Sequence, residues 1–269
     1  MRKLTALVAG MTLAMAALPA AAGVVITQKQ HVSSGTRTQD SEQTISVQGN
    51  KQKMVTEKHT IITDLDKGVM YVIDPTAKTY FEVEFPPKGP MAAMMAASQG
   101  AAMNFKKAGT TREIAGYKCT DYNGGGHMMQ GDYTVKECFS TSAPGAKEFA
   151  AFEKNMTDKL KSVGTAQAGG EIPDGVPLAT DSVMKMGHGA IPGMKPEDAA
   201  KVSEMMAKRP PLLMNQTVEK IESKKLSDAD FAVPADFTKR ELPAAPAMGS
   251  MKMAPAAGAP GAGAPPAAH

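Results

Sequence analysis

Residues 114–139 read IAGYKCTDYNGGGHMMQGDYTVKECF and contain both cysteines of the chain. Residues 114–119 and 133–139 have the composition of β-strands, and the Asn-Gly-Gly-Gly run at 123–126 is too flexible to continue a strand. We therefore expect a β-hairpin whose turn lies at these glycines, with the rest of the fold arranged around it.

One register of this hairpin satisfies three cross-strand pairs at once: Cys119 with Cys138, Asp121 with Lys136, and Tyr122 with Val135. It places the cysteines on the face opposite Tyr122 and Val135. We expect a disulfide, which closes a loop long enough to contribute about 3 kcal/mol of stability. The alternative is a pair of buried thiols that are not bonded to each other.

The start of the chain has the pattern of an export signal. Arg2 and Lys3 precede an uncharged apolar stretch at 4–18, and three alanines at 20–22 offer a cleavage site. We expect residues 1–22 to be a cleavable signal peptide and the protein to work in the periplasm; the alternative is a retained N-terminal anchor helix. No cysteine directly follows the apolar stretch, so a lipid anchor at the cleavage site is not expected. No later apolar stretch is long enough to cross a bilayer.

Composition limits the partners. The net charge of +3 falls to +1 when Arg2 and Lys3 leave with the signal peptide, which gives no electrostatic reason to bind nucleic acid or an anionic membrane. The chain has 21 methionines, 5% aromatic residues and no tryptophan. Soft apolar side chains of this kind favour an adaptable apolar surface.

Residues 23–85 predict an antiparallel meander, because short strand-like runs alternate with turn signals. The expected strands are 24–32, 43–48, 51–56, 60–63, 69–73 and 79–85. The last of these points Phe81, Val83 and Phe85 to one side and polar residues to the other, which is typical of a sheet with one buried and one solvated face.

Helical periodicity appears in insertions between strands rather than in alternating crossovers. We expect helices near 91–105, 142–163 and 195–209, and further strands at 176–186 and 212–221. The fold class is therefore α+β: a curled antiparallel half-barrel of about eight or nine strands with inserted helices on its concave face. It spans residues 23–242, and residues 243–269, rich in Ala, Pro, Gly and Met, are expected to be a disordered tail.

Several motifs carry a family resemblance: DLDKGVMYVIDP at 64–75, KTY at 78–80, IAGYKC at 114–119 and FAVP at 231–234. They resemble an uncharacterised family of exported bacterial proteins that is similar in fold to the LolA/LolB-type lipoprotein carriers. The resemblance implies an unclosed barrel and a carrier or sensor of a hydrophobic ligand. It transfers no functional residues.

The apolar faces of the first two helices are the candidate ligand site, and the expected partner is a lipid or an acylated molecule. The residues are Met91, Met94, Met95, Phe149, Phe152 and Met156. The alternative interpretation is that these side chains only pack the helices on the sheet.

A second function class is a periplasmic Cu(I) site, because thioether and imidazole ligands select Cu(I). Its candidate ligands are His127, Met128, Met129, Met184, Met186 and His188. The sequence lacks the nucleophile, zinc and phosphate-loop motifs of common enzymes, so we expect a non-enzymatic protein without a cofactor. A third possibility is a passive envelope protein that binds neither metal nor lipid.

Overall fold

The computed structural model describes residues 23–88, 105–128, 131–162, 172–186 and 196–241. The expected signal peptide at 1–22, the methionine-rich helix near 91–105, apart from Phe105, and the expected tail at 243–269 lie outside these residues. Where the side chains of the described residues are discussed below, His127 and Met128 are left aside.

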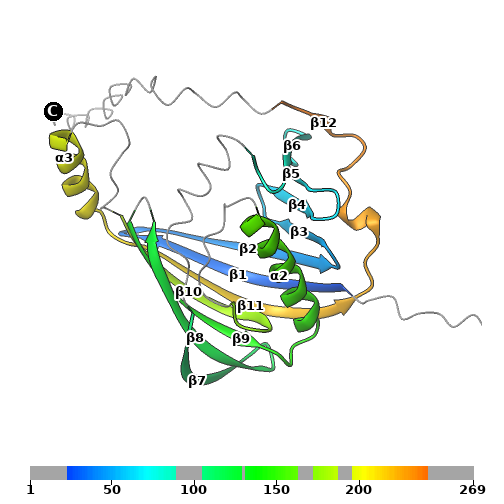
Figure 1. The fold of residues 1–269 in the computed structure, drawn as a ribbon, viewed down its shortest axis with the longest axis horizontal. Coiled ribbons are helices and arrows are strands. Elements are labelled where there is room, and N and C mark those ends of the chain that lie inside the picture. Colours follow the sequence, from blue (N-terminus) through cyan, green and yellow to red (C-terminus); the bar gives the residue numbers. More distant parts are fainter. Residues whose placement is uncertain (1–22, 89–104, 129–130, 163–171, 187–195, 242–269) are drawn as a thin grey trace, which may run out of the picture.

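The described elements follow the expected order, with a long meander first and helices inserted later (Figure 1). The strands are β1 (Gly23–Ser34), β2 (Arg37–Gln48), β3 (Lys51–Val55), β4 (Thr60–Asp64), β5 (Val69–Asp74), β6 (Thr79–Glu84), β7 (Lys106–Ile114), β8 (Tyr117–Met128), β9 (Gly131–Ser140), β10 (Val176–Met186), β11 (Leu212–Lys224) and β12 (Thr238–Lys239). The helices are α2 (Ala146–Ser162), α3 (Pro196–Ala207) and the short 3₁₀ helix η1 (Asp228–Phe231).

These strands form one curved sheet of twelve strands in the order β12-β6-β5-β4-β3-β2-β1-β11-β10-β9-β8-β7. Two meanders, β1 to β6 and β7 to β11, join where β1 pairs with β11, and only the β12–β6 pair is parallel. The ends of the order, β12 and β7, do not pair with each other, so the sheet is unclosed. The predicted class is confirmed in this coarser form, but the predicted eight or nine strands are too few.

The main core lies between α2 and the inner face of the sheet, which we define as the face that α2 covers (Figure 1). Ile26 of β1 and Leu178 of β10 belong to the same buried cluster as Phe149 and Phe152 of α2. Phe152 is fully buried. The helix therefore holds together strands from both meanders, which are distant in sequence.

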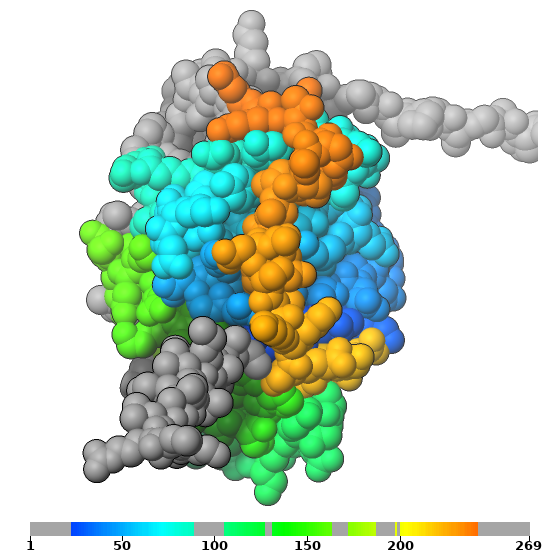
Figure 2. Space-filling view, turned by 90° about the vertical axis from the view of Figure 1, so that its right-hand side faces the viewer, coloured from blue at the N-terminus to red at the C-terminus, as the bar shows by residue number. Residues whose placement is uncertain are grey.

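The outer face of the first meander is covered as well. Residues 225–239, the C-terminal strap, run across the outer surface of the sheet in Figure 2. Leu226 and Phe231 of this strap pack in a second buried cluster with Ile62 and Ile73, and Tyr80 packs against it. The predicted solvated face is confirmed at Glu82 and Glu84, which are exposed, whereas Tyr80 on the same face is half-buried because it packs against this cluster.

The sequence around the cysteines folds differently from the predicted hairpin. Ala115 and Gly116 have positive φ angles of 50° and 80° and form a turn between β7 and β8. β8 then continues through the glycine run to Met128. At Gly124 a Cβ atom would lie 3.0 Å from the Phe105 ring, so glycine here lets this ring pack on the strand. The glycines permit close packing inside a strand and do not form its turn.

The register of the β8–β9 pair is consequently shifted by two residues from the predicted one. The three predicted cross-strand partnerships are replaced by Asp121 opposite Cys138, Tyr122 opposite Glu137, Asn123 opposite Lys136 and Gly124 opposite Val135. A shift of two keeps each side chain on its predicted face. The cysteines therefore still share a face, opposite Tyr122 and Val135.

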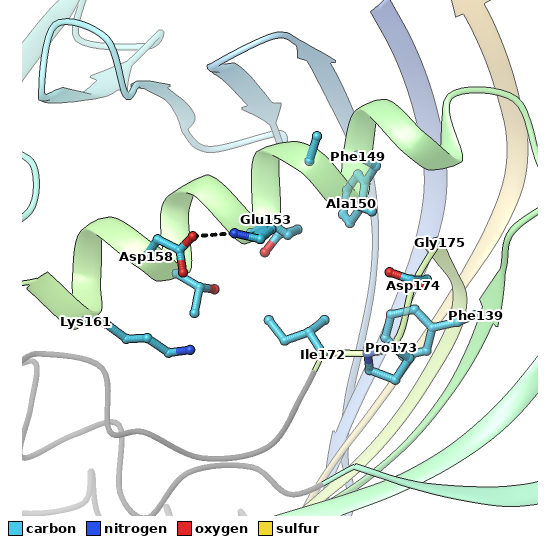
Figure 3. A pocket seen from close by; sticks show the side chains of 13 residues that line it. Phe139, Phe149, Ala150, Glu153, Asp158, Lys161, Ile172, Pro173, Asp174 and Gly175 are labelled. Carbon is cyan, nitrogen blue, oxygen red and sulfur yellow. Dashed lines mark hydrogen bonds and ion pairs between the residues drawn. The ribbon is translucent and has the colours of Figure 1, made fainter.

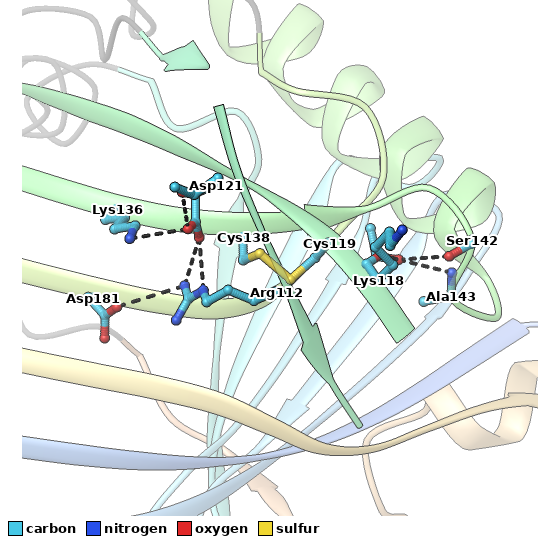
Figure 4. Close-up of a disulfide and its surroundings, with 11 residues drawn as sticks. Arg112, Lys118, Cys119, Asp121, Lys136, Cys138, Ser142, Ala143 and Asp181 are labelled. Carbon is cyan, nitrogen blue, oxygen red and sulfur yellow. Dashed lines mark hydrogen bonds and ion pairs between the residues drawn. A yellow bond between two sulfur atoms is a disulfide. The ribbon is translucent and has the colours of Figure 1, made fainter. Parts of the chain in front are cut away.

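The predicted disulfide is present between Cys119 and Cys138, whose Cα atoms are 5.3 Å apart (Figure 4). Beside it lies the carboxylate of Asp121, which is 1% exposed. Lys136 Nζ is 3.1 Å and Arg112 Nη2 2.9 Å from its oxygens, and Thr110 Oγ1 donates at 2.6 Å. Burial alone would raise the pKa of Asp121, but the hydrogen bonds from Thr110 and Lys136 and the Arg112 charge outweigh it, so the pKa lies below its usual value.

Candidate functional site

Local contacts fix the start of α2 against the sheet. Gly145 has a φ of 70°, and a Cβ atom at this residue would lie 2.3 Å from Val24 Cβ. Only glycine allows the backbone at residue 145 to come this close to the Val24 side chain. Glu148 Oε1 accepts a hydrogen bond from the Gly49 amide at 2.6 Å, and Asn155 Nδ2 donates to Asn50 Oδ1 at 2.8 Å. The helix is thereby held across the turn between β2 and β3.

A cavity of about 410 Å³ lies between α2, the end of β9 and residues 172–175. We call it the α2 cavity. Figure 3 shows Phe139, Ile172 and Pro173 facing the helix across the open space. The residues that line it are Phe139, Phe149, Ala150, Ala151, Glu153, Lys154, Thr157, Asp158, Lys161, Ile172, Pro173, Asp174 and Gly175. Its aromatic and aliphatic walls therefore adjoin a set of charged helix side chains.

A second cavity, of about 190 Å³, opens on the inner face of the sheet between strands of the two meanders. We call it the polar cavity. Its lining residues are Gln28, Gln43, Ile45, Glu137, Pro177, Leu178, Ala179, Thr180 and Gln216. Uncharged amides and one carboxyl group therefore line it, with apolar residues from β2 and β10.

Two glutamates link these cavities. Burial raises the pKa of Glu137 to about 7; a hydrogen bond with Thr180 opposes this, and the charge of Glu153 adds to it. Burial likewise raises the pKa of Glu153 to about 7, against a hydrogen bond with Gln52. Glu137 lines the polar cavity, and Phe139, two residues further along the same face of β9, lines the α2 cavity. The two cavities are therefore neighbours along β9.

These raised pKa values predict how stability changes with pH. The folded-state pKa of about 7 lies above the ordinary 4.5, so the folded protein binds protons more tightly than the unfolded chain. The contribution to stability is fully present below the unfolded pKa and is lost as the pH rises through 7. We expect Glu137→Gln to raise the free energy of unfolding by about 1 to 3 kcal/mol at about pH 8 and to leave it unchanged near pH 4.

Denaturant titrations at the two pH values measure this effect. Glu113, an exposed residue of β7, provides the control, and Glu113→Gln is expected to change neither value. An equal effect of Glu137→Gln at both pH values would show that the carboxyl group of Glu137 is not held neutral by burial.

The predicted apolar ligand residues do not all line the α2 cavity in the structure. Phe149 lines the α2 cavity, whereas Phe152 is fully buried in the core and Met156 packs against that core. Met91, Met94 and Met95 lie outside the described residues.

The predicted copper ligands are only partly described. Strand register places Met128 of β8 and Met186 of β10 opposite the same residue, Gly131 of β9. Met184 lies two residues before Met186 on β10, while Met129 and His188 lie outside the described residues. Among the described residues, His, Cys, Asp and Glu form no group of three or more that could hold a metal ion. The copper site stays a prediction.

Sequence reasoning missed the polar residues of the inner face. The sequence places Glu137 in a predicted strand and Glu153 in a predicted helix, without marking either as a site residue. The available signal is weak: Glu137 alternates with Val135 and Phe139, which are buried, so it occupies an inward strand position. Gln28 and Gln43 can be identified as neighbours only from the β1–β2 register, in which they are directly opposite each other.

Residues 25–163 match the model of a family described as a domain of unknown function (DUF4412). Because the match covers more than half of the chain, the protein belongs to this family, which confirms the predicted membership of an uncharacterised family. No curated protein matches the sequence. In the described part of the chain no helix has the length and hydropathy needed to span a membrane.

The chain is also similar to several solved structures. A LolA superfamily protein, NE2245 from Nitrosomonas europaea, matches with 8% identity and a TM-score of 0.30 over 80% of this chain and 91% of that one. A putative outer membrane lipoprotein-sorting protein domain from Vibrio parahaemolyticus matches with 5% identity and a TM-score of 0.31 over 78% and 89%. PNGF-II matches with 10% identity and a TM-score of 0.38 over 82% of this chain, which spans 31% of the PNGF-II chain.

Proposed function

We propose that this protein binds or carries a hydrophobic, acyl-chain-like ligand, without catalysing a reaction, and that its α2 cavity holds the chain of that ligand. The observation that carries the proposal is the volume left between α2, the end of β9 and residues 172–175. At about 410 Å³ it lies within the range of small-molecule sites, about 300 to 1,000 Å³. A helix that served only to close the core would leave little such space.

The lining of the α2 cavity supports an amphiphilic ligand. Phe139, Phe149 and Ile172 supply apolar walls, and burying apolar ligand surface against them is favourable by about 25 cal/mol per Å². Lys154 and Lys161 lie among the charged residues of the same cavity. The alkyl chain of a ligand can therefore lie against the apolar walls of the cavity while its polar end lies near the charged residues.

The disulfide supports a location outside the cytoplasm, since disulfides persist in oxidising compartments. Together with the export pattern at 1–22, it favours the periplasm as the place where the ligand is bound.

A substitution that fills the α2 cavity tests the site. Ala151 is exposed on α2 and lines the cavity, so Ala151→Phe places a ring in the space with little strain on the core. We expect this variant to bind decanol about tenfold or more weakly than the wild type, because the ring removes apolar contact area equivalent to about 1.4 kcal/mol or more. Isothermal titration calorimetry measures the affinity.

Lys147→Phe is the matched control, since Lys147 is exposed on the same helix and does not line the cavity. It is expected to bind decanol as the wild type does. Equal affinity in the Ala151→Phe variant would place the ligand elsewhere. A wild-type protein without affinity for decanol, which also yields no lipid in organic extracts from its native host, would refute the carrier function.

A further inference from the structure

The polar cavity is lined by amide groups that are open to hydrogen bonds from water or a ligand. Gln28 and Gln43 are each 8% exposed, and in the described part of the chain neither side-chain amide makes a hydrogen bond. Both line the cavity together with Glu137. Such amides form their hydrogen bonds with water or with a bound ligand.

Among the described residues, the groups around Glu137 include carboxyl, phenol, amide and hydroxyl groups but no basic side chain. The titratable groups that act on Glu137 or are affected by it are Glu153 of α2 and Tyr133 of its own strand. The strands β1, β2 and β11 contribute the neutral amides of Gln28, Gln43 and Gln216, and β10 contributes the Thr180 hydroxyl. None of these groups is basic. When Glu137 ionises, its negative charge therefore has no cation beside it within this set, whereas Glu153 shares the α2 cavity with Lys154 and Lys161.

We propose that the polar cavity binds the ammonium group of an amphiphilic amine whose alkyl chain lies in the α2 cavity. This inference rests on the proposed function and specifies the ligand class of the same site. A primary ammonium group has three donors. The carboxylates of Glu137 and Glu153 and the amide oxygens of Gln28 and Gln43 are acceptors of the required kind, and they belong to two neighbouring cavities.

The arrangement also discriminates between head groups. An anionic head group in the polar cavity would meet the carboxyl group of Glu137, and no cation is among the residues that line this cavity, so it is disfavoured there. An alcohol can form hydrogen bonds but gains nothing from the negative charge. An ammonium group both forms hydrogen bonds and is attracted by the negative charge. Its hydrogen bonds are about twice as strong as neutral ones because both partners are ionised.

The test compares decylamine, decanol and propylamine by calorimetry at about pH 8, where the glutamates are ionised and the amine is protonated. We expect decylamine to bind about tenfold or more tightly than decanol. Glu137→Gln should lower the affinity for decylamine more than the affinity for decanol, so that the two ligands bind about equally well. Glu113→Gln, on exposed β7, should change neither. Lowering the pH to about 5 should weaken decylamine binding only, because Glu137 then becomes neutral.

The outcomes separate this inference from the proposed function. Equal binding of decylamine and decanol, or decylamine binding that is insensitive to Glu137→Gln, would overturn the ammonium site while the apolar site stands. Propylamine that binds as tightly as decylamine would identify the ligand as a small amine. It would overturn the inference that the ligand has an alkyl chain in the α2 cavity. Failure of both decyl compounds to bind would overturn the proposed function, and the ammonium site with it.

Discussion

Phe152→Ala is expected to lower the free energy of unfolding by about 3 to 5 kcal/mol, because it empties a fully buried aromatic site. Phe152 shares the core cluster with Val24 and Ile26 of β1 and Leu178 of β10, so its ring lies in the core that joins both meanders to α2. The loss would be a large part of the total stability of a domain, which is about 5 to 15 kcal/mol. Denaturant-induced unfolding, followed by circular dichroism, measures the difference.

A conservative substitution controls this prediction. Phe152→Leu keeps much of the apolar volume and is expected to cost less than half as much as Phe152→Ala. Because α2 forms one wall of the cavity, Phe152→Ala should also weaken decanol binding. A loss of stability below about 1 kcal/mol would mean that α2 is not packed on the sheet as described.

Removing the disulfide is expected to lower stability by about 3 kcal/mol, the chain-entropy value for a loop of this length. The bond joins Cys119 and Cys138, which are 19 residues apart in sequence and almost completely buried. The test variant is Cys119→Ala with Cys138→Ala, since alanine leaves no polar group in the core. Thermal unfolding under oxidising conditions measures the loss.

Chemical reduction provides an independent check. Wild-type protein treated with a reducing agent after unfolding should refold with the same lowered stability as the double variant, while the double variant should not respond to the agent. Equal stability of the oxidised and reduced wild type would contradict the role of the disulfide as a staple between β8 and β9.

The first meander could be predicted from sequence because its turns carry strong local signals. The predicted strands leave turns at 49–50 and 64–68; the first is observed there, and the second begins one residue later because β4 includes Asp64. The strands β4, β5 and β6 begin at the predicted residues. The strand around Pro177 was also predicted with its observed limits, 176–186. In these segments local propensity and tertiary structure favour the same conformation.

The second meander could not be read correctly because glycine has two opposite uses. Gly116 with its positive φ forms a turn that sequence reasoning placed inside a strand. Gly124 lies in a strand that sequence reasoning ended, because the Phe105 ring occupies the space of its missing side chain. Which use applies depends on a residue distant in sequence, so the local pattern did not reveal β7 or the length of β8.

The candidate site depends on register in the same way. Phe149 could be identified from helical periodicity, but its partner across the cavity, Ile172, comes from a segment without a periodic pattern. The approach of Glu137 to Glu153 requires both the β9–β10 pairing and the position of α2. A one-residue slip of β9 would turn Glu137 to the outer face.

The most direct test of a ligand chain in the α2 cavity is a set of nuclear Overhauser effects from ¹³C-labelled decanol bound to the protein. The cavity predicts effects between the alkyl chain and both the Phe149 ring and the Ala150 methyl group, which line it from the helix. Effects confined to other apolar surface, such as the exposed Met205 of α3, with none to Phe149 or Ala150, would contradict this account.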